Sequence, residues 1–127
     1  MRPMDVRIRP VHPGLQSWQK ARVEEMLRAR IGSNISLAEL AAACAISASH
    51  FARSFRSTFG TSARQYLIRL RVERAKALLA QTNKSLAQIA DLCGFCDQAA
   101  FTRAFNRAEQ ITPLRWRQLN NSQRRHG

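Results

Sequence analysis

The sequence predicts an all-α fold in which two similar lobes are joined by a long connecting helix. Three observations predict it: apolar residues recur at helical spacing, a helix-capping motif occurs twice, and the two halves align with each other. A chain of 127 residues with 45% hydrophobic content can bury one sizeable core or two small ones. We expect a flexible basic arm over 1–14, lobes over 15–60 and 82–119, a connecting helix over 61–81 and a basic tail over 120–127.

The first lobe opens with a predicted helix from Leu15, in which apolar side chains recur at helical spacing up to Ile31 and Gly32 follows as a stop. The next helix is marked by Ser36-Leu-Ala-Glu39. In such a capping box the Ser hydroxyl accepts from a first-turn amide while the Glu carboxylate reaches back to the Ser amide.

The capping box recurs 49 residues later as Ser85-Leu-Ala-Gln88. Beyond the following turn the offset becomes 50, where Phe51 matches Phe101 and Arg53 matches Arg103, so the second turn carries one extra residue. Each half is thus a capped short helix, a tight turn and a second helix with apolar residues four apart. This is the helix-turn-helix pattern.

The predicted core of each half combines a stripe on its first helix with phenylalanine anchors on its second. These residues are Leu37, Leu40, Ala41, Cys44, Phe51, Phe55 and Phe59 in the first half, and Leu86, Ile89, Ala90, Cys93, Phe101 and Phe105 in the second. Gly94 suits a left-handed helix end, whereas Ala45 at the equivalent place is less suited to it. We therefore expect the first turn to differ in shape from the second.

Two further helices complete the prediction. The connecting helix, over 62–80, is apolar on two sides, which favours contact with both lobes. Thr112-Pro113 supplies an N-cap followed by Pro at the first helical position, and opens a last helix that we expect to end at Leu119. The tail beyond it is expected to fray.

The charge of the chain indicates a polyanionic partner. The formal net charge is +13, and eighteen of the 21 basic residues are arginine. The planar guanidinium matches phosphate oxygens and the guanine edge, which favours recognition of nucleic acid over mere solubility. No acidic residue falls between Glu39 and Glu73.

A helix in the major groove of DNA buries one face and presents short polar or Arg side chains on the other. Both second helices meet this requirement. The residues expected to contact DNA are Ser49, His50, Ala52, Arg53 and Arg56 in the first half, and Gln98, Ala99, Thr102, Arg103 and Asn106 in the second. The candidates for phosphate contacts are Ser36, Arg71, Ser85, Thr112 and Arg115.

The length of the connecting helix suggests how the two halves bind. A helix of about 18 residues spans roughly 27 Å, and one turn of B-DNA advances about 34 Å. We expect the two recognition helices to enter successive major grooves, with bending of the DNA or adjustment of one lobe making up the difference, and a monomer bound to an asymmetric site.

The run from Gly94 to Phe105, closed by Thr112-Pro-Leu-Arg-Trp-Arg117, resembles the second helix-turn-helix and signature region of AraC/XylS-type regulators. The segment 66–79 is similar to the connecting helix of that family, and the likeness covers about 15–119. It implies a seven-helix, two-lobed domain that binds promoter DNA and usually activates transcription through RNA polymerase. Gln110 and Trp116 stand where the family commonly has Gly and Tyr.

Carried over residue by residue, the resemblance implies two sets of base-contacting positions. They are Ser49, Ala52 and Arg53 in the first half, and Gln98, Ala99 and Arg103 in the second. The likeness extends to the stand-alone subgroup of the family, and a chain cut from a longer parent is the alternative.

Several other classes are disfavoured. The first twenty residues contain no continuous apolar core, and no apolar run approaches membrane-spanning length, so we expect a cytosolic, nucleoid-associated protein. We expect no cofactor or metal, because Cys93-Gly-Phe-Cys96 has no second pair and Cys93 falls on the buried stripe. The alternatives left open are a non-specific architectural DNA binder, an accessory domain of a larger regulator or of a DNA-repair alkyl transferase, and an adaptor for peptide or RNA.

Overall fold

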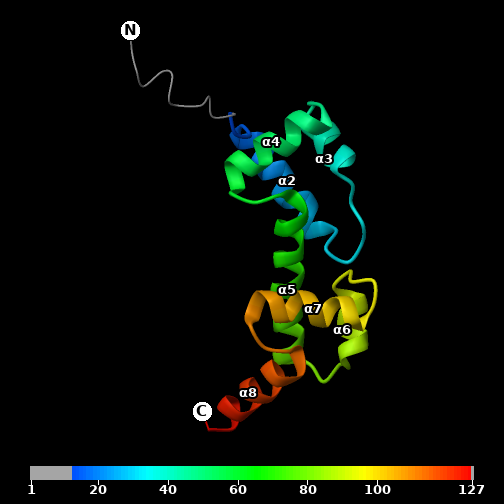
Figure 1. Ribbon diagram of the computed structural model, residues 1–127, viewed down its shortest axis with the longest axis vertical. Helices are drawn as coiled ribbons and strands as arrows, with labels where there is room; N and C mark the ends of the chain where they lie inside the picture. Colours follow the sequence, from blue (N-terminus) through cyan, green and yellow to red (C-terminus); the bar gives the residue numbers. More distant parts are fainter. Residues whose placement is uncertain (1–12, 127) are drawn as a thin grey trace. The chain divides into compact units, whose positions relative to one another are not determined.

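The computed structural model describes residues 13–126, in which there are seven helices and no strand (Figure 1). The all-α prediction is confirmed; most of the predicted arm lies outside the described residues. The helices are α2 (Ser17–Ala29), α3 (Leu37–Ala43), α4 (Ala48–Phe59), α5 (Ala63–Gln81), α6 (Leu86–Leu92), α7 (Gln98–Glu109) and α8 (Pro113–His126). Within the described residues they form two compact units, one of 13–26 with Ser36–Ala63, the other of Leu27–Ile35 with 64–126.

The first unit packs α3 and α4 against most of α2. Its buried apolar side chains are Val23, Leu40, Ala41, Cys44, Phe51 and Phe55. Leu37, predicted to lie on the buried stripe, is instead 40% exposed because it occupies the first turn of α3. Gln19 Nε2 on α2 donates to the Cys44 carbonyl (3.0 Å), and just before the helix the Leu15 amide donates to Thr58 Oγ1 (2.7 Å).

The two helix-turn-helix turns begin with the same left-handed backbone, so the difference expected at Ala45 is not found, although the second turn is one residue longer. Ala45 adopts φ +61° and Gly94 adopts φ +86°, both in the left-handed region. The residue after each donates to an equivalent carbonyl: Ile46 to Ala41 (3.1 Å), and Phe95 to Ala90 (3.0 Å). The hydrogen bond at the end of the helix holds Ala45 in the left-handed conformation, although Ala45 carries a Cβ.

The second unit packs α6 and α7 against α5 (Figure 1). Its core is formed by Val72, Ala75, Leu79, Ile89, Ala90, Cys93, Phe101 and Phe105. Phe95 and Trp116 are partly buried against this core, and the Trp116 ring meets Phe105 edge-on. The connection between α6 and α7 is one residue longer than that between α3 and α4, as the change of offset predicts.

The loop before α3 packs with the second unit, a grouping that the sequence pattern does not predict. Arg71 on α5 donates from Nε to the Ile31 carbonyl (2.9 Å) and from Nη2 to the Ser33 carbonyl (3.2 Å). The Ile31 carbonyl also abuts Gly94, where any Cβ would clash with it. Gly94 is thus required both by its positive φ and by this close approach.

The last helix continues to His126, so the prediction that it ends at Leu119 is wrong. Between 120 and 126 there is no Gly or Pro to stop it. Its start is as predicted, because Thr112 Oγ1 accepts from the Arg115 amide (3.2 Å) and Pro113 occupies the first helical position.

Candidate nucleic-acid interface

Helix α4 is the candidate recognition helix of the first unit. Ser47 caps its start, where the Ser47 hydroxyl accepts from the His50 amide (3.1 Å), and Gly60 ends it at φ +76°. Phe51 and Phe55 are fully buried and hold one face of the helix against the core. The opposite face of α4 therefore points to solvent.

The predicted DNA-contacting residues of α4 lie on that outward face. Ser49, His50, Arg53 and Arg56 are exposed, and Ala52 is half-buried at the flank. Ser54, which lies between these residues in the sequence, is instead buried. It follows Phe51 by three positions, which returns it to the core side of the helix.

Helix α7 repeats this arrangement in the second unit. Asp97 caps it, with Oδ1 accepting from the Ala100 amide (2.7 Å), and Phe101 and Phe105 are fully buried. The predicted contact residues Gln98, Ala99, Arg103 and Asn106 are exposed, and Thr102 is half-buried. Arg53 and Arg103 therefore project from equivalent places on two helices of the same length.

The caps of α4 and α7 differ in charge. Ser47 is neutral, whereas Asp97 places a carboxylate at the start of α7. A carboxylate there stabilises the helix by complementing its dipole. It also disfavours close approach of a phosphate, so the two helices present different electrostatic surfaces.

Three of the predicted phosphate contacts are helix caps. Ser36 and Ser85 form complete capping boxes: each hydroxyl accepts from the third helical amide, and the Glu39 and Gln88 side chains accept from the two serine amides. Thr112 caps α8 in the same manner, but without a reciprocal partner. The capping predictions are confirmed, and phosphate contact at these residues remains a prediction.

The two predicted arginine contacts have different surroundings. Arg115 is exposed on α8. Arg71 is half-buried and held by two backbone carbonyls, and burial lowers the pKa of its guanidinium from its very high usual value while the neighbouring thiols Cys93 and Cys96 oppose that shift. A guanidinium stays protonated near neutral pH, so Arg71 is a fixed positive charge.

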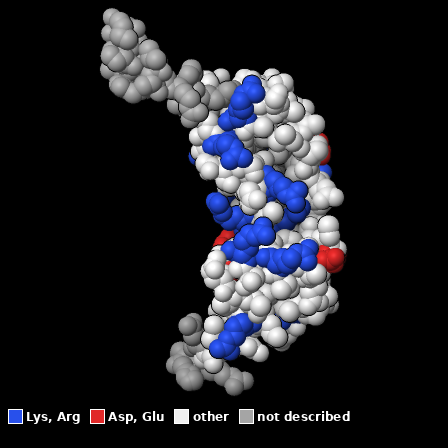
Figure 2. Space-filling view, viewed as in Figure 1, with Lys and Arg blue, Asp and Glu red and all other residues white. Residues whose placement is uncertain are grey.

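Basic side chains gather over α5 and α7 on the face shown in Figure 2, with acidic side chains at its margins. This distribution agrees with the long segment free of acidic residues that precedes Glu73. Such a surface attracts a polyanion and predicts an affinity that falls with salt.

Residues 18–119 match the model of the helix-turn-helix domain family. The chain belongs to the AraC-type helix-turn-helix family. The similar AraC-type structure from Chromobacterium violaceum superposes with a TM-score of 0.75 at 29% identity, covering 80% of this chain and 91% of that one.

Two further comparisons bear on function. The DNA-binding domain of AdpA, described as a global transcriptional factor in complex with a target DNA, matches with a TM-score of 0.78 at 30% identity, covering 84% of this chain and 96% of that one. The probable transcriptional regulator LumQ of Photobacterium leiognathi is 35% identical over 94 residues, 74% of this chain but 38% of LumQ. The chain thus spans about a third of the length of the first curated relatives it matches.

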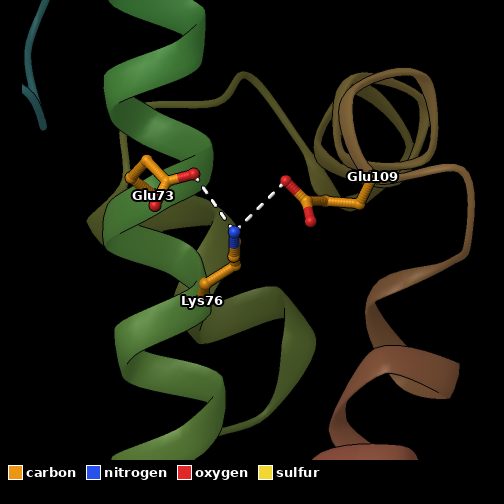
Figure 3. Close-up of polar contacts among 3 residues, drawn as sticks. All are labelled: Glu73, Lys76 and Glu109. Atoms are coloured by element: carbon orange, nitrogen blue, oxygen red, sulfur yellow. Dashed lines mark hydrogen bonds and ion pairs between the residues drawn. The ribbon is translucent and has the colours of Figure 1, made fainter.

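Two groups of residues that position α7 and α8 are not predicted by the sequence pattern of this AraC-type chain. Lys76 on α5 bonds Glu73 (3.2 Å) and, across to α7, Glu109 (3.3 Å) (Figure 3). Burial alone would lower the pKa of Lys76, but the bonds and charges of these carboxylates raise it overall. Arg117 on α8 donates to the carbonyls of Leu79, Thr82 and Lys84 at 2.7–3.2 Å.

No local signal in the sequence could have found these contacts. Glu109 lies 33 residues from Lys76, and the carbonyls that bind Arg117 lie 33 to 38 residues before it. An arginine bound to carbonyls has the same local sequence context as one exposed to solvent.

The cysteines fit the predicted structural role. All three are free; Cys44 and Cys93 are buried, and Cys96 is exposed. Burial raises the pKa of Cys44 and Cys93, which keeps both as neutral thiols near pH 7. Within the described residues there is no group of three His, Cys, Asp or Glu that could hold a metal ion, and none of the described helices is both long and apolar enough to cross a membrane.

Proposed function

We propose that the chain is a sequence-specific regulator that binds double-stranded promoter DNA as a monomer in the cytoplasm and activates transcription by contact with RNA polymerase. The observation that carries the proposal is the matched pair α4 and α7. Each is capped, anchored by two buried phenylalanines and exposes an arginine at the same register. The similarity to a DNA-bound relative supports the proposal.

In the proposed complex, α4 and α7 enter successive major grooves on one side of the duplex. Arg53 and Arg103 bond guanine edges, Gln98 bonds adenine, and the exposed methyl of Ala99 packs on thymine. Because the two helices carry different side chains, the expected site is asymmetric and does not require a second copy of the chain.

Selection from random duplexes, followed by sequencing, tests specificity and spacing together. We expect two conserved blocks about one helical turn apart, and a complex with one chain per duplex in analytical ultracentrifugation. Equal affinity for all duplexes would favour an architectural DNA binder instead. Absence of duplex binding would favour the peptide or RNA adaptor.

Activation needs a separate measurement. Transcription from a promoter carrying the selected site is expected to rise when the chain is added to purified RNA polymerase. The matched control is the double variant Arg53→Ala, Arg103→Ala, which keeps both sets of phenylalanine anchors. A decrease in transcription with the unmodified chain would indicate a repressor.

A further inference from the structure

A groove of about 500 Å³ lies within the second unit, between α5, α7 and the loop before α3. Four guanidinium groups line it, from Arg64, Arg71, Arg103 and Arg107, and no carboxylate is among the described residues around it. The apolar side chains of Leu67, Ile68 and Phe95 also line it. We call it the arginine groove.

The groove borders the outward face of α7. With 3.6 residues per turn, Ala99, Thr102 and Asn106 share one flank of the helix, whereas Ala100, Ala104 and Arg107 share the other. Only the second flank lines the groove. Arg103 lies between the two flanks, exposed and in the lining of the groove.

The lining of the groove is complementary to a sugar-phosphate backbone. Phosphates require positive charge, which the four guanidiniums supply without a carboxylate to neutralise them. The deoxyribose rings present apolar faces, which Leu67, Ile68 and Phe95 can contact. Arg71 is already held by two carbonyls, so one guanidinium of the groove is fixed in place before any ligand binds.

We propose that the arginine groove holds the sugar-phosphate backbone of bound DNA. Arg64 and Arg107 contact phosphates there, while Arg103, one turn away on α7, contacts a base edge. This inference rests on the proposed function and assigns two positioning contacts that lie outside the recognition faces.

The salt dependence of binding separates these contacts from base contacts. Arg64→Ala and Arg107→Ala are each expected to lower the slope of log affinity against log salt by about 1, with the same fold-loss for the selected duplex and for a random one. Arg74→Ala is the matched control, because Arg74 is exposed on α5 but does not line the groove. It is expected to leave the slope close to that of the unmodified chain.

Cys96 provides an independent reporter, because it lines the groove and is the exposed one of the three cysteines. A neutral alkylating reagent is expected to modify Cys96 at least tenfold more slowly when the chain is saturated with duplex, whether selected or random.

Three outcomes would overturn the inference. If neither arginine variant changes the affinity and DNA leaves Cys96 reactivity unchanged, the groove lies outside the interface although the chain binds DNA. A loss confined to the selected duplex would make Arg64 and Arg107 base contacts. A chain that binds no duplex at all would refute the proposed function itself, and with it this inference.

Discussion

At the scale of single residues, two equivalent helix ends differ in one side chain. Gly60 ends α4 at φ +76° and Gln110 ends α7 at φ +69°, so the same left-handed backbone carries a glycine once and a glutamine once. A residue with a Cβ is strained in this region, and a glycine is not. Comparison of Gly60 with Gln110 therefore measures the free-energy cost of a Cβ on a left-handed backbone.

We expect Gly60→Ala to lower the free energy of unfolding by about 1 kcal/mol and Gln110→Gly to raise it by a similar or smaller amount. A Cβ at Gly60 would meet no atom within 4 Å, so the loss reports the backbone alone. Gln110→Gly gives up an exposed bond from Nε2 to the Arg107 carbonyl, which reduces its gain. Denaturant unfolding measures both, and two changes of the same sign would contradict the explanation.

Arg103 gives the second prediction at this scale. Arg103→Ala is expected to weaken binding to the selected duplex by about 1 to 3 kcal/mol and to relax the preference at one base pair, because a bidentate bond to a guanine edge is lost. Titration against duplexes that differ at each position measures this. A uniform loss on all duplexes would make Arg103 a phosphate contact.

At the scale of elements, the phenylalanines connect the core to the recognition faces. Phe55 and Phe105 are fully buried, and each packs against the preceding phenylalanine of its helix. Phe55→Ala or Phe105→Ala is expected to cost roughly 3 to 5 kcal/mol of stability, because each leaves a cavity under its recognition helix. Thermal melting checks this, with exposed Asn106→Ala as the control; an unchanged melting temperature in either phenylalanine variant would contradict its role as an anchor.

Elements specified by nearby residues were predictable from the sequence. The capping boxes at Ser36 and Ser85 and the phenylalanines four apart determine α3, α4, α6 and α7 within a few residues of their own position. The outward faces of the recognition helices follow from the same spacing. The end of α8 was misplaced because polar residues, which carry no stop signal, follow Leu119.

Features that depend on distant residues were not predictable. The grouping of 27–35 with the second unit depends on Arg71, about 40 residues away along the chain. The arginine groove likewise joins the loop at Asn34 to Arg64 and Arg107, whose proximity no local pattern encodes. Composition indicates an anionic partner but does not show which arginines gather in one place.

At the scale of the whole molecule, each compact unit contains one buried thiol, Cys44 in the first and Cys93 in the second. Burial raises the pKa of both above the value of an unfolded thiol, about 8.5. Below that pH both thiols are protonated in the folded and in the unfolded chain, so they do not change the free energy of unfolding. As pH rises through 8.5 the unfolded chain loses these protons while the folded one keeps them, so stability falls.

The expected result is a free energy of unfolding that declines from about pH 8.5 upward. The decline is expected to become shallower in the double variant Cys44→Ala, Cys93→Ala, whatever the absolute stability of that variant. Denaturant unfolding between pH 7 and 10 measures the slope, with exposed Cys96→Ala as the control. An unchanged slope in the double variant would show that other groups determine the pH dependence.

The two carbonyl-binding arginines occupy similar places in the two halves of the chain. Arg71 on α5 binds the loop before α3, and Arg117 on α8 binds the loop before α6, so in each half an arginine on the helix that follows the helix-turn-helix binds the loop that precedes it. Residues 27–35 belong to the second unit together with Arg71, so both sets of bonds lie within that unit. The loop before α3 is therefore held at its start by a different unit from the one that contains α3.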